Sequence, residues 1–130
     1  MTVAFWCVLI TGLMPFAAIA VAKWDKDFLR NNGQPRDWEA KFTGKRSRAH
    51  AAHLNTFEAF PLFAAAVIIA AICKSPQPIV DGIAIAFVLT RAVYIWCYIA
   101  DLATPRSLVW MVGLGLSISL FFVAAFAGAK

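Results

Sequence analysis

Four long apolar runs, each with few charged side chains, constrain this 130-residue chain more than any other feature. A helix rises about 1.5 Å per residue, so about 20 apolar residues cross the roughly 30 Å hydrocarbon layer of a bilayer. Only helices and closed barrels satisfy their backbone polar groups in lipid, and these runs lack the alternation of barrel strands. We therefore expect membrane-spanning helices at about 3–22, 49–73, 79–100 and 108–129.

The composition agrees with a membrane protein, because 62% of the residues are hydrophobic and only 15% are charged. Soluble domains have about 45–50% apolar and about 25% charged residues. The low charge and the 11 Phe, 5 Trp and 2 Tyr exclude a disordered chain. Cys7, Cys73 and Cys97 are odd in number and lack a C-x-x-C spacing, so we interpret them as core thiols. The chain is predicted to be one all-α domain, an integral membrane four-helix bundle over residues 1–130.

The basic residues predict how the bundle is oriented. Eight of the twelve Lys and Arg residues lie in the polar segment 23–48, and Arg106 lies in the third connection. Because cytoplasmic loops are enriched in Lys and Arg, these two connections are expected in the cytoplasm and both termini outside, as in a bacterial inner membrane. The net charge of +5 then reflects topology, and no nucleic-acid partner is expected. A cleaved signal peptide is the alternative for the first run, but the run is long and has no basic residues before it.

Several polar residues lie inside the apolar runs, where an ionisable group costs about 2.5–3.5 kcal/mol. Measured by helical rise from the cytoplasmic edge, Asn55 and Glu58 lie about 10 and 15 Å deep in the second helix. In the third helix, Tyr94 and Arg91 reach the same two depths. Glu58 and Arg91 are therefore expected at one level on antiparallel helices.

These residues also share helix faces, because positions three, four or seven apart lie on one side of a helix. Arg48 joins the second-helix pair, and Tyr98 joins the third-helix pair. Arg106 and Ser107 open the fourth helix on the same side of the membrane, where free backbone N–H groups and the helix dipole favour an anion. The pattern predicts one pocket open to the cytoplasm, suited to a small ligand that carries several charges.

One structural alternative and one metal-site alternative compete with this interpretation. Glu58 and Arg91 would form a buried ion pair that fixes helix register, the tyrosines would be interfacial residues, and Arg106 would extend to the membrane surface. The clustering of all these groups favours the pocket. His50-x-x-His53 has the spacing of a metal-binding pair, but no third ligand follows at a suitable distance, so no metal site is expected.

The run Asn55-Thr-Phe-Glu58-Ala-Phe-Pro61-Leu-Phe resembles the second-helix motif of the MAPEG family, the membrane-associated proteins of eicosanoid and glutathione metabolism. The tyrosine series of the third helix and Arg106-Ser107 resemble the same family, and the similarity covers nearly the whole chain. The resemblance to a bacterial-type member implies a homotrimer of four-helix subunits. It also implies that glutathione, as co-substrate, binds at subunit interfaces on the cytoplasmic side and reacts with a lipophilic small molecule or lipid.

The resemblance further implies roles for single residues. Arg106, helped by Ser107, would be catalytic and stabilise the glutathione thiolate. The residues implied to bind glutathione are Lys23, Arg48, His53, Asn55, Glu58, Arg91, Tyr94 and Tyr98. Among them, Asn55 and Glu58 would hold the γ-glutamyl end, Glu58 would also pair with Arg91, and Lys23 would reach the site of a neighbouring subunit.

One position departs from the family pattern. Family synthases commonly carry a glutathione-binding arginine four residues before the motif Asn, and this chain has Ala51 there. Arg48 lies one turn earlier on nearly the same face, and we hypothesise that it substitutes. Loss of a charge-assisted hydrogen bond of about 1.5–3 kcal/mol would weaken binding about ten-fold or more.

Three functions follow in order of preference. The first is a membrane-bound glutathione transferase or peroxidase that acts on lipophilic electrophiles or hydroperoxides. The second, favoured by Ala51, is a non-catalytic MAPEG-like protein that binds a lipid or a partner. The third is a small drug/proton antiporter, which is disfavoured because the first apolar run contains no acidic residue.

Overall fold

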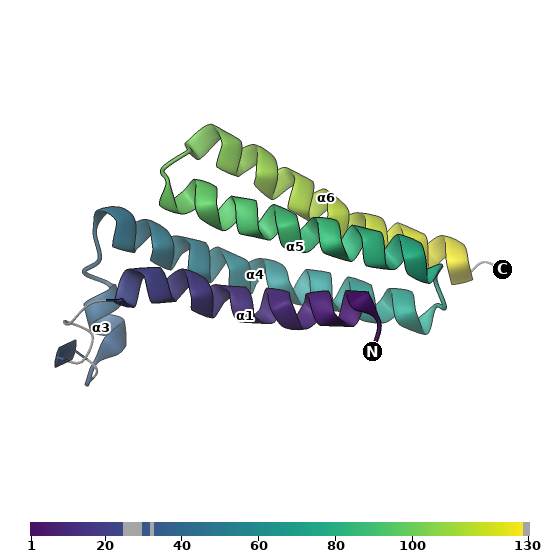
Figure 1. Ribbon diagram of the computed structural model, residues 1–130, viewed down its shortest axis with the longest axis horizontal. Helices are drawn as coiled ribbons and strands as arrows, with labels where there is room; N and C mark the ends of the chain where they lie inside the picture. Colours follow the sequence, from purple (N-terminus) through teal and green to yellow (C-terminus); the bar gives the residue numbers. More distant parts are fainter. Residues whose placement is uncertain (25–29, 32, 129–130) are drawn as a thin grey trace.

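The computed structural model describes residues 1–24, 30–31 and 33–128. Four long helices run side by side, up and down, as a bundle: α1 (Val3–Lys23), α4 (Gly44–Ile72), α5 (Gln77–Ile99) and α6 (Ala103–Gly128) (Figure 1). A short helix, α3 (Pro35–Glu39), lies near the end of α1 and the start of α4, and we call this the α3 end of the bundle. All four long helices are long and apolar enough to cross a membrane, which confirms the predicted all-α membrane fold.

Two helices begin earlier than the hydropathy indicates. α4 begins at Gly44 rather than near residue 49, and α6 begins at Ala103 rather than near residue 108. The extra residues are mostly polar, so the hydropathy marks where each helix enters the apolar layer and not where it starts. Pro105 lies in the first turn of α6, where a missing backbone N–H costs little.

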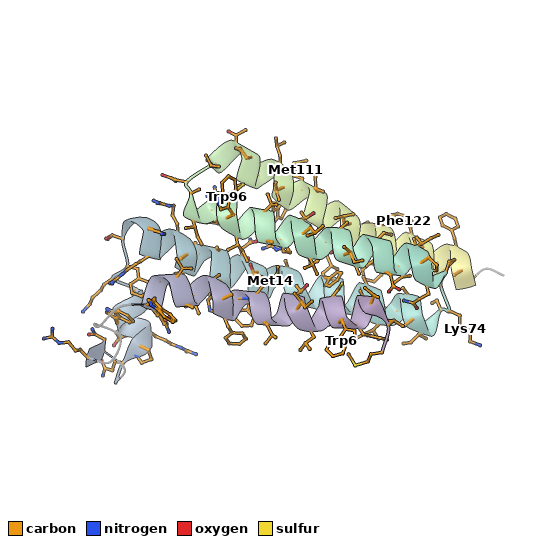
Figure 2. All side chains as sticks on the ribbon, viewed as in Figure 1. Trp6, Met14, Lys74, Trp96, Met111 and Phe122 are labelled. Carbon is orange, nitrogen blue, oxygen red and sulfur yellow. The ribbon has the colours of Figure 1, made fainter. Side chains whose placement is uncertain are left out.

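The outward faces of the bundle are apolar, as expected for helices that lipid surrounds. Trp96, Met111 and Phe122 project away from the helices in Figure 2 and are each at least 60% exposed. The interior holds many small residues, which let helices approach closely without a large core. Between α4 and α5, the rings of Phe63 and Phe87 stack with centroids 4.0 Å apart.

Asp81 connects α5 to the start of α1. Its Oδ1 accepts hydrogen bonds from the backbone N–H of Ala4 at 2.7 Å and from Nε2 of Gln77 at 2.8 Å. The Thr2 hydroxyl accepts a bond from the Phe5 N–H at 3.4 Å, so two of the first amides of α1 are satisfied by side chains. This carboxylate therefore acts as a helix cap supplied by another helix.

Candidate functional site

Arg91 of α5 is the centre of the polar cluster inside the bundle. It is only 2% exposed, and its Nη2 donates hydrogen bonds to Oδ1 of Asn55 at 3.0 Å and to Oγ1 of Thr56 at 3.1 Å. The Thr56 hydroxyl donates in turn to the Ala52 carbonyl at 2.7 Å. The guanidinium carbon lies 4.1 Å from the centroid of the Tyr94 ring. Neutral oxygens and an aromatic face thus surround this buried cation.

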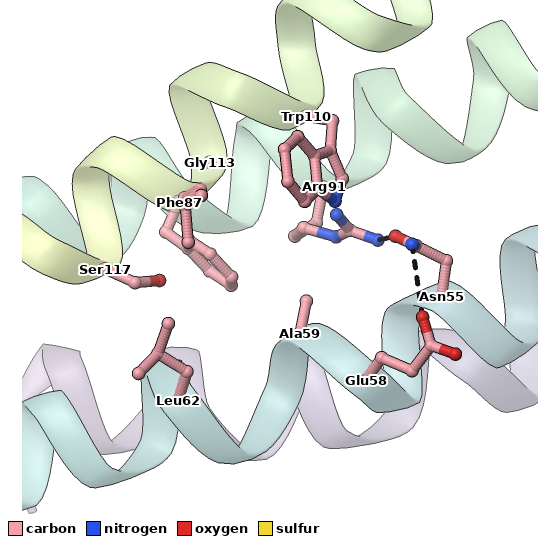
Figure 3. A pocket seen from close by; sticks show the side chains of 10 residues that line it. Asn55, Glu58, Ala59, Leu62, Phe87, Arg91, Trp110, Gly113 and Ser117 are labelled. Carbon is pink, nitrogen blue, oxygen red and sulfur yellow. Dashed lines mark hydrogen bonds between the residues drawn. The ribbon is translucent and has the colours of Figure 1, made fainter.

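Glu58 is connected to Arg91 through Asn55 and not directly. The Asn55 amide donates from Nδ2 to Oε2 of Glu58 at 3.4 Å while its oxygen accepts from the guanidinium (Figure 3). The predicted Glu58–Arg91 ion pair is therefore wrong for the residues that the structure describes. Asn55 lies one turn earlier on α4 and reaches the guanidinium, whereas Glu58 points to the exposed side of the helix.

Two adjoining cavities open along α4, α5 and α6. The polar cavity, of about 240 Å³, lies nearer the α3 end. It is lined by Asn55, Tyr94, Tyr98, Arg106, Ser107 and Trp110. The deep cavity, of about 160 Å³, lies further along the helices. It is lined by Asn55, Glu58, Ala59, Leu62, Phe87, Arg91, Trp110, Gly113, Leu114 and Ser117 (Figure 3).

Cations and aromatic rings alternate beside the polar cavity. The Arg106 guanidinium carbon lies 4.3 Å from the centroid of the Tyr98 ring. Tyr98 in turn meets Tyr94 edge to face, with centroids 5.6 Å apart, and Tyr94 stacks on Arg91. Because the rings fix both guanidinium groups without neutralising them, their charge remains available to a ligand.

The start of α6 differs from the prediction. Because α6 begins at Ala103, the Arg106 backbone N–H already donates to the Leu102 carbonyl at 3.0 Å. The expectation that free amides at Arg106 and Ser107 attract an anion is therefore wrong. The Ser107 hydroxyl donates to the Ala103 carbonyl at 3.2 Å, and its oxygen still has room to accept a hydrogen bond. Arg106 and Ser107 therefore contribute their side chains, and not their backbone amides, to the polar cavity.

Arg48, the predicted substitute for the family arginine at position 51, contacts the end of α5 in the single chain. Its Nε donates to the Ile99 carbonyl at 3.2 Å, and its Nη1 lies 3.7 Å from Asp101. A cation is favoured there because the last carbonyls of α5 are the negative end of the helix dipole. Arg48 lines neither cavity within the single chain, and its substitution for the missing arginine stays a prediction.

His53 and Lys23 also lie away from both cavities. The His53 Nδ1 lies 2.7 Å from the Pro15 carbonyl oxygen, because this side of α4 packs against α1. Lys23 ends α1 and forms an ion pair with Glu39 of α3, which in turn lies 3.8 Å from Nε2 of His50. In the single chain His53 packs against α1, and its predicted part in binding glutathione stays a prediction. The predicted contact of Lys23 with a neighbouring subunit stays a prediction.

Three residues of the cluster have no role in the sequence-based prediction, namely Thr56, Trp110 and Ser117. A threonine inside a transmembrane helix usually bonds its own backbone, so the residue type of Thr56 does not indicate a site. Trp110 and Ser117 follow Arg106 by 4 and 11 residues, which is the spacing of one helix face. Extending that spacing from Arg106 along the fourth helix would have found both.

The arrangement suits a polar ligand more than a metal ion. Two guanidinium groups, one carboxylate and one amide converge on the two cavities. Such groups bind carboxylates and an ammonium group through charge-assisted hydrogen bonds. Within the described parts of the chain, His, Cys, Asp and Glu side chains form no group of three that could hold a metal ion.

Comparisons with curated proteins and with solved structures find no match to this chain. The family model described as "MAPEG family" matches residues 3–126, which include the four long helices almost entirely. The match covers both the Asn55–Pro61 segment of α4 and the arginine and tyrosine residues of the cavities. The chain therefore belongs to the MAPEG family.

Proposed function

We propose that the polar cavity binds glutathione and that the protein is a membrane-bound glutathione transferase or peroxidase. The observation that carries the proposal is the place of Arg106, stacked on Tyr98 and facing a cavity beside Asn55 and Ser107, in a chain of the MAPEG family. Glutathione carries two carboxylates, one ammonium group and one thiol. Arg91 and Glu58, beside Asn55 where the deep cavity adjoins the polar one, would match a carboxylate and the ammonium group, and Arg106 lies in the polar cavity itself.

Arg106 would hold glutathione as the thiolate, because a neighbouring cation lowers the pKa of a thiol. In transfer to an aryl chloride, the sulfur lone pair forms the new carbon–sulfur bond and chloride leaves with its bonding electrons. In reduction of a hydroperoxide, the sulfur attacks the terminal oxygen, the O–O bond breaks, and the alkoxide takes a proton and leaves as the alcohol. A second glutathione then reduces the resulting sulfenic acid, which gives glutathione disulfide and water.

The deep cavity supports a lipophilic second substrate. It adjoins the polar cavity at Asn55 and Trp110 and is walled by Leu62, Phe87 and Leu114. The apolar outer surface of the bundle supports entry of molecules dissolved in the membrane through this opening. The charged glutathione and a lipophilic second substrate would therefore meet beside Arg106.

Formation of the glutathione thiolate tests the role of Arg106. Glutathione is added to purified protein in a stopped-flow instrument, and the ultraviolet absorbance of the thiolate is followed. We expect the band to appear with the wild type and to be lost in Arg106→Ala. Arg36→Ala, which removes an exposed arginine of α3, is the matched control and should keep the band. A wild type without the band, or an Arg106→Ala variant that keeps it, would refute the catalytic assignment.

A second candidate function is binding of a lipid without chemistry. Ala51 favours it, because Arg48 lines neither cavity within the single chain. Glutathione-dependent turnover of a simple aryl chloride separates the two candidates. Turnover that disappears in Glu58→Ala excludes the non-catalytic function, whereas lipid binding without turnover or thiolate supports it.

We further propose that the α3 end faces the cytoplasm of a bacterial cell, because most of the Lys and Arg residues lie there. Single cysteines at positions 36 and 74 in a cysteine-free variant report the orientation. A membrane-impermeant maleimide should label Lys74→Cys in intact cells and Arg36→Cys only after lysis. The opposite labelling pattern would show the inverted orientation.

A further inference from the structure

Thr56 of α4 lies directly behind the wall of the two cavities. Its side chain is fully buried and lines neither cavity, although the preceding residue, Asn55, lines both. Its Oγ1 lies 3.1 Å from Nη2 of Arg91, which lines the deep cavity. Thr56 therefore acts on a bound ligand through the residues that it contacts and not directly.

The state of the Thr56 hydroxyl is set by the backbone of α4. A hydroxyl has one hydrogen, and Thr56 donates it to the Ala52 carbonyl at 2.7 Å. The oxygen is then left with acceptor capacity only. Arginine has donors and no acceptor, so the bond between the two side chains runs from Nη2 of Arg91 to Oγ1 of Thr56. The hydroxyl is thus prepared to hold a guanidinium group.

Both hydrogens of Arg91 Nη2 are used by α4. One goes to Thr56 and the other to Oδ1 of Asn55 at 3.0 Å. The Asn55 atom that faces the guanidinium must be the amide oxygen, because Arg91 cannot accept a hydrogen bond. The amide nitrogen is thereby turned to Oε2 of Glu58, which it meets at 3.4 Å (Figure 3). The orientations of Asn55 and Glu58 therefore depend on where Arg91 is held.

Thr56 is the fixed point of this arrangement. Its oxygen is tied to the helix backbone at Ala52, whereas Asn55 holds Arg91 with a side chain whose own bonds can rotate. Among the described residues, Nε and Nη1 of Arg91 have no hydrogen-bond partner. A guanidinium anchored at Asn55 alone could therefore swing and carry the Asn55 amide with it.

Thr90 of α5 shows the same residue type without the second contact. Its hydroxyl also donates to a carbonyl four residues earlier, that of Ala86, at 2.7 Å. Such an internal bond is the usual way to satisfy a threonine inside a transmembrane helix. Within the described part of the chain the Thr90 hydroxyl has no other partner, and it lines neither cavity. Thr56 and Thr90 thus differ in the bond to Arg91.

We propose that Thr56 is a positioning residue, whose hydroxyl holds the Arg91 guanidinium and thereby sets Asn55 and Glu58 for glutathione. The inference rests on the proposed function, since it names a residue that prepares the same site without touching the ligand. Serine, which keeps the hydroxyl, should replace threonine, whereas valine, which keeps only the shape, should not. The effect falls on glutathione binding, because Arg106, which would hold the thiolate, lies on α6 and stacks on Tyr98 instead.

Glutathione-dependent turnover of a simple aryl chloride in nanodiscs separates binding from chemistry. We expect Thr56→Val to raise the KM for glutathione about ten-fold and to leave kcat nearly unchanged. Thr56→Ala, a second variant without the hydroxyl, should do the same. Thr56→Ser should keep the wild-type KM, and so should the matched control Thr90→Val. An unchanged KM in both variants without the hydroxyl, or a serine variant as impaired as the valine variant, would overturn the proposal.

Labelling of Arg91 provides a readout that needs no turnover. Phenylglyoxal modifies accessible guanidinium groups, and peptide mass spectrometry gives the rate at each arginine in the absence of glutathione. Arg91 should react about ten-fold faster in Thr56→Val than in the wild type or Thr56→Ser. The exposed Arg36 should react at one rate in all of them.

The two readouts distinguish failure of the positioning role from failure of the proposed function. Equal labelling of Arg91 in the wild type, Thr56→Val and Thr56→Ser would overturn the positioning role even in an active enzyme. A wild type that forms no thiolate and shows no turnover would overturn the proposed function. Faster labelling of Arg91 in Thr56→Val would then still support the hold of Thr56 on Arg91, and equal labelling would overturn it.

Discussion

Arg91 shows how a single cation is kept inside an apolar bundle. Its charge-assisted bonds from Nη2 to Asn55 and Thr56 and its stacking on Tyr94 replace part of the water that it loses on burial, whereas its Nε has no hydrogen-bond partner among the described residues. The same contacts fix Asn55, which in turn orients Glu58 at the edge of the cavities. Arg91 therefore supports both the fold and the candidate site.

Replacing Arg91 by methionine tests this role, because methionine fills a similar space without donors. We expect the free energy of unfolding to fall by about 1.5–3 kcal/mol, since the acceptors of Asn55 and Thr56 lose a charged donor. Unfolding of the purified protein in mixed micelles measures the change. Arg36→Met, at an exposed position of α3, should be neutral. An equally stable Arg91→Met variant would show that the bonds contribute nothing to stability.

For single residues, the sequence predicted the level along the bundle better than it predicted the hydrogen-bond partners. Asn55, Tyr94, Tyr98 and Arg106 line one cavity as predicted from their spacing. Glu58 does not pair with Arg91, because equal depth on two helices does not decide which side chain reaches across. Spacing alone also cannot show that a carbonyl, as at Ile99 for Arg48, attracts a side chain away from a pocket.

At the scale of elements, α1 depends on α5 for its start. The first amides of a helix have no partner within that helix, and Asp81 supplies one to Ala4 from 77 positions along the chain. Asp81→Ala should therefore lower the free energy of unfolding by about 1–2 kcal/mol, as the loss of a helix cap does. Asp81→Asn keeps an oxygen acceptor and should lose less. Thermal unfolding distinguishes the two variants, and equal midpoints for Asp81→Ala and the wild type would contradict the capping role.

The second prediction at this scale concerns the face of α6 that lines both the polar and the deep cavity, which together form one groove. The probe is a dodecyl chain with a dinitrophenyl group, which reports binding because it quenches tryptophan fluorescence. Gly113→Leu should fill the middle of the groove and weaken binding of this probe at least ten-fold, because the dodecyl chain can no longer lie against Phe87. Gly115 has open space around it, so Gly115→Leu is the matched control. The thiolate band should persist in both variants, since Arg106 lies two turns away. Unchanged probe binding in Gly113→Leu would show that the ligand does not lie along this face.

Helix existence was predictable from hydropathy, whereas helix ends were not. Runs of apolar residues mark the part of a helix that lies in lipid, and the polar first residues of α4 and α6 lie beyond it. The capping role of Asp81 could not be predicted from the sequence either, because a cap contributed by another helix leaves no local sequence signal.

At the scale of the whole molecule, the groove leaves polar groups uncovered at membrane depth. Glu58 and Ser107 are exposed, and so are Leu62, Trp110 and Leu114 beside them. An ionisable group such as Glu58 in contact with lipid would cost about 2.5–3.5 kcal/mol. A second protein surface over the groove would remove this cost, and the resemblance that places homotrimers in this family suggests that further copies of the chain supply it.

We therefore predict that three copies assemble in the membrane and that the site works only in the assembly. Native mass spectrometry from nanodiscs should give three times the mass of one chain, with no dominant monomer. Dilution into excess detergent should separate the copies, and the thiolate absorbance per chain should fall in parallel with the trimer fraction, because the groove loses its cover.

Arg36→Ala is the control and should show the same dependence of thiolate absorbance on trimer fraction as the wild type, since α3 carries this exposed arginine away from the groove. A separated chain that still forms the thiolate would mean that the polar cavity of one copy is sufficient, and the uncovered carboxylate would then need another explanation.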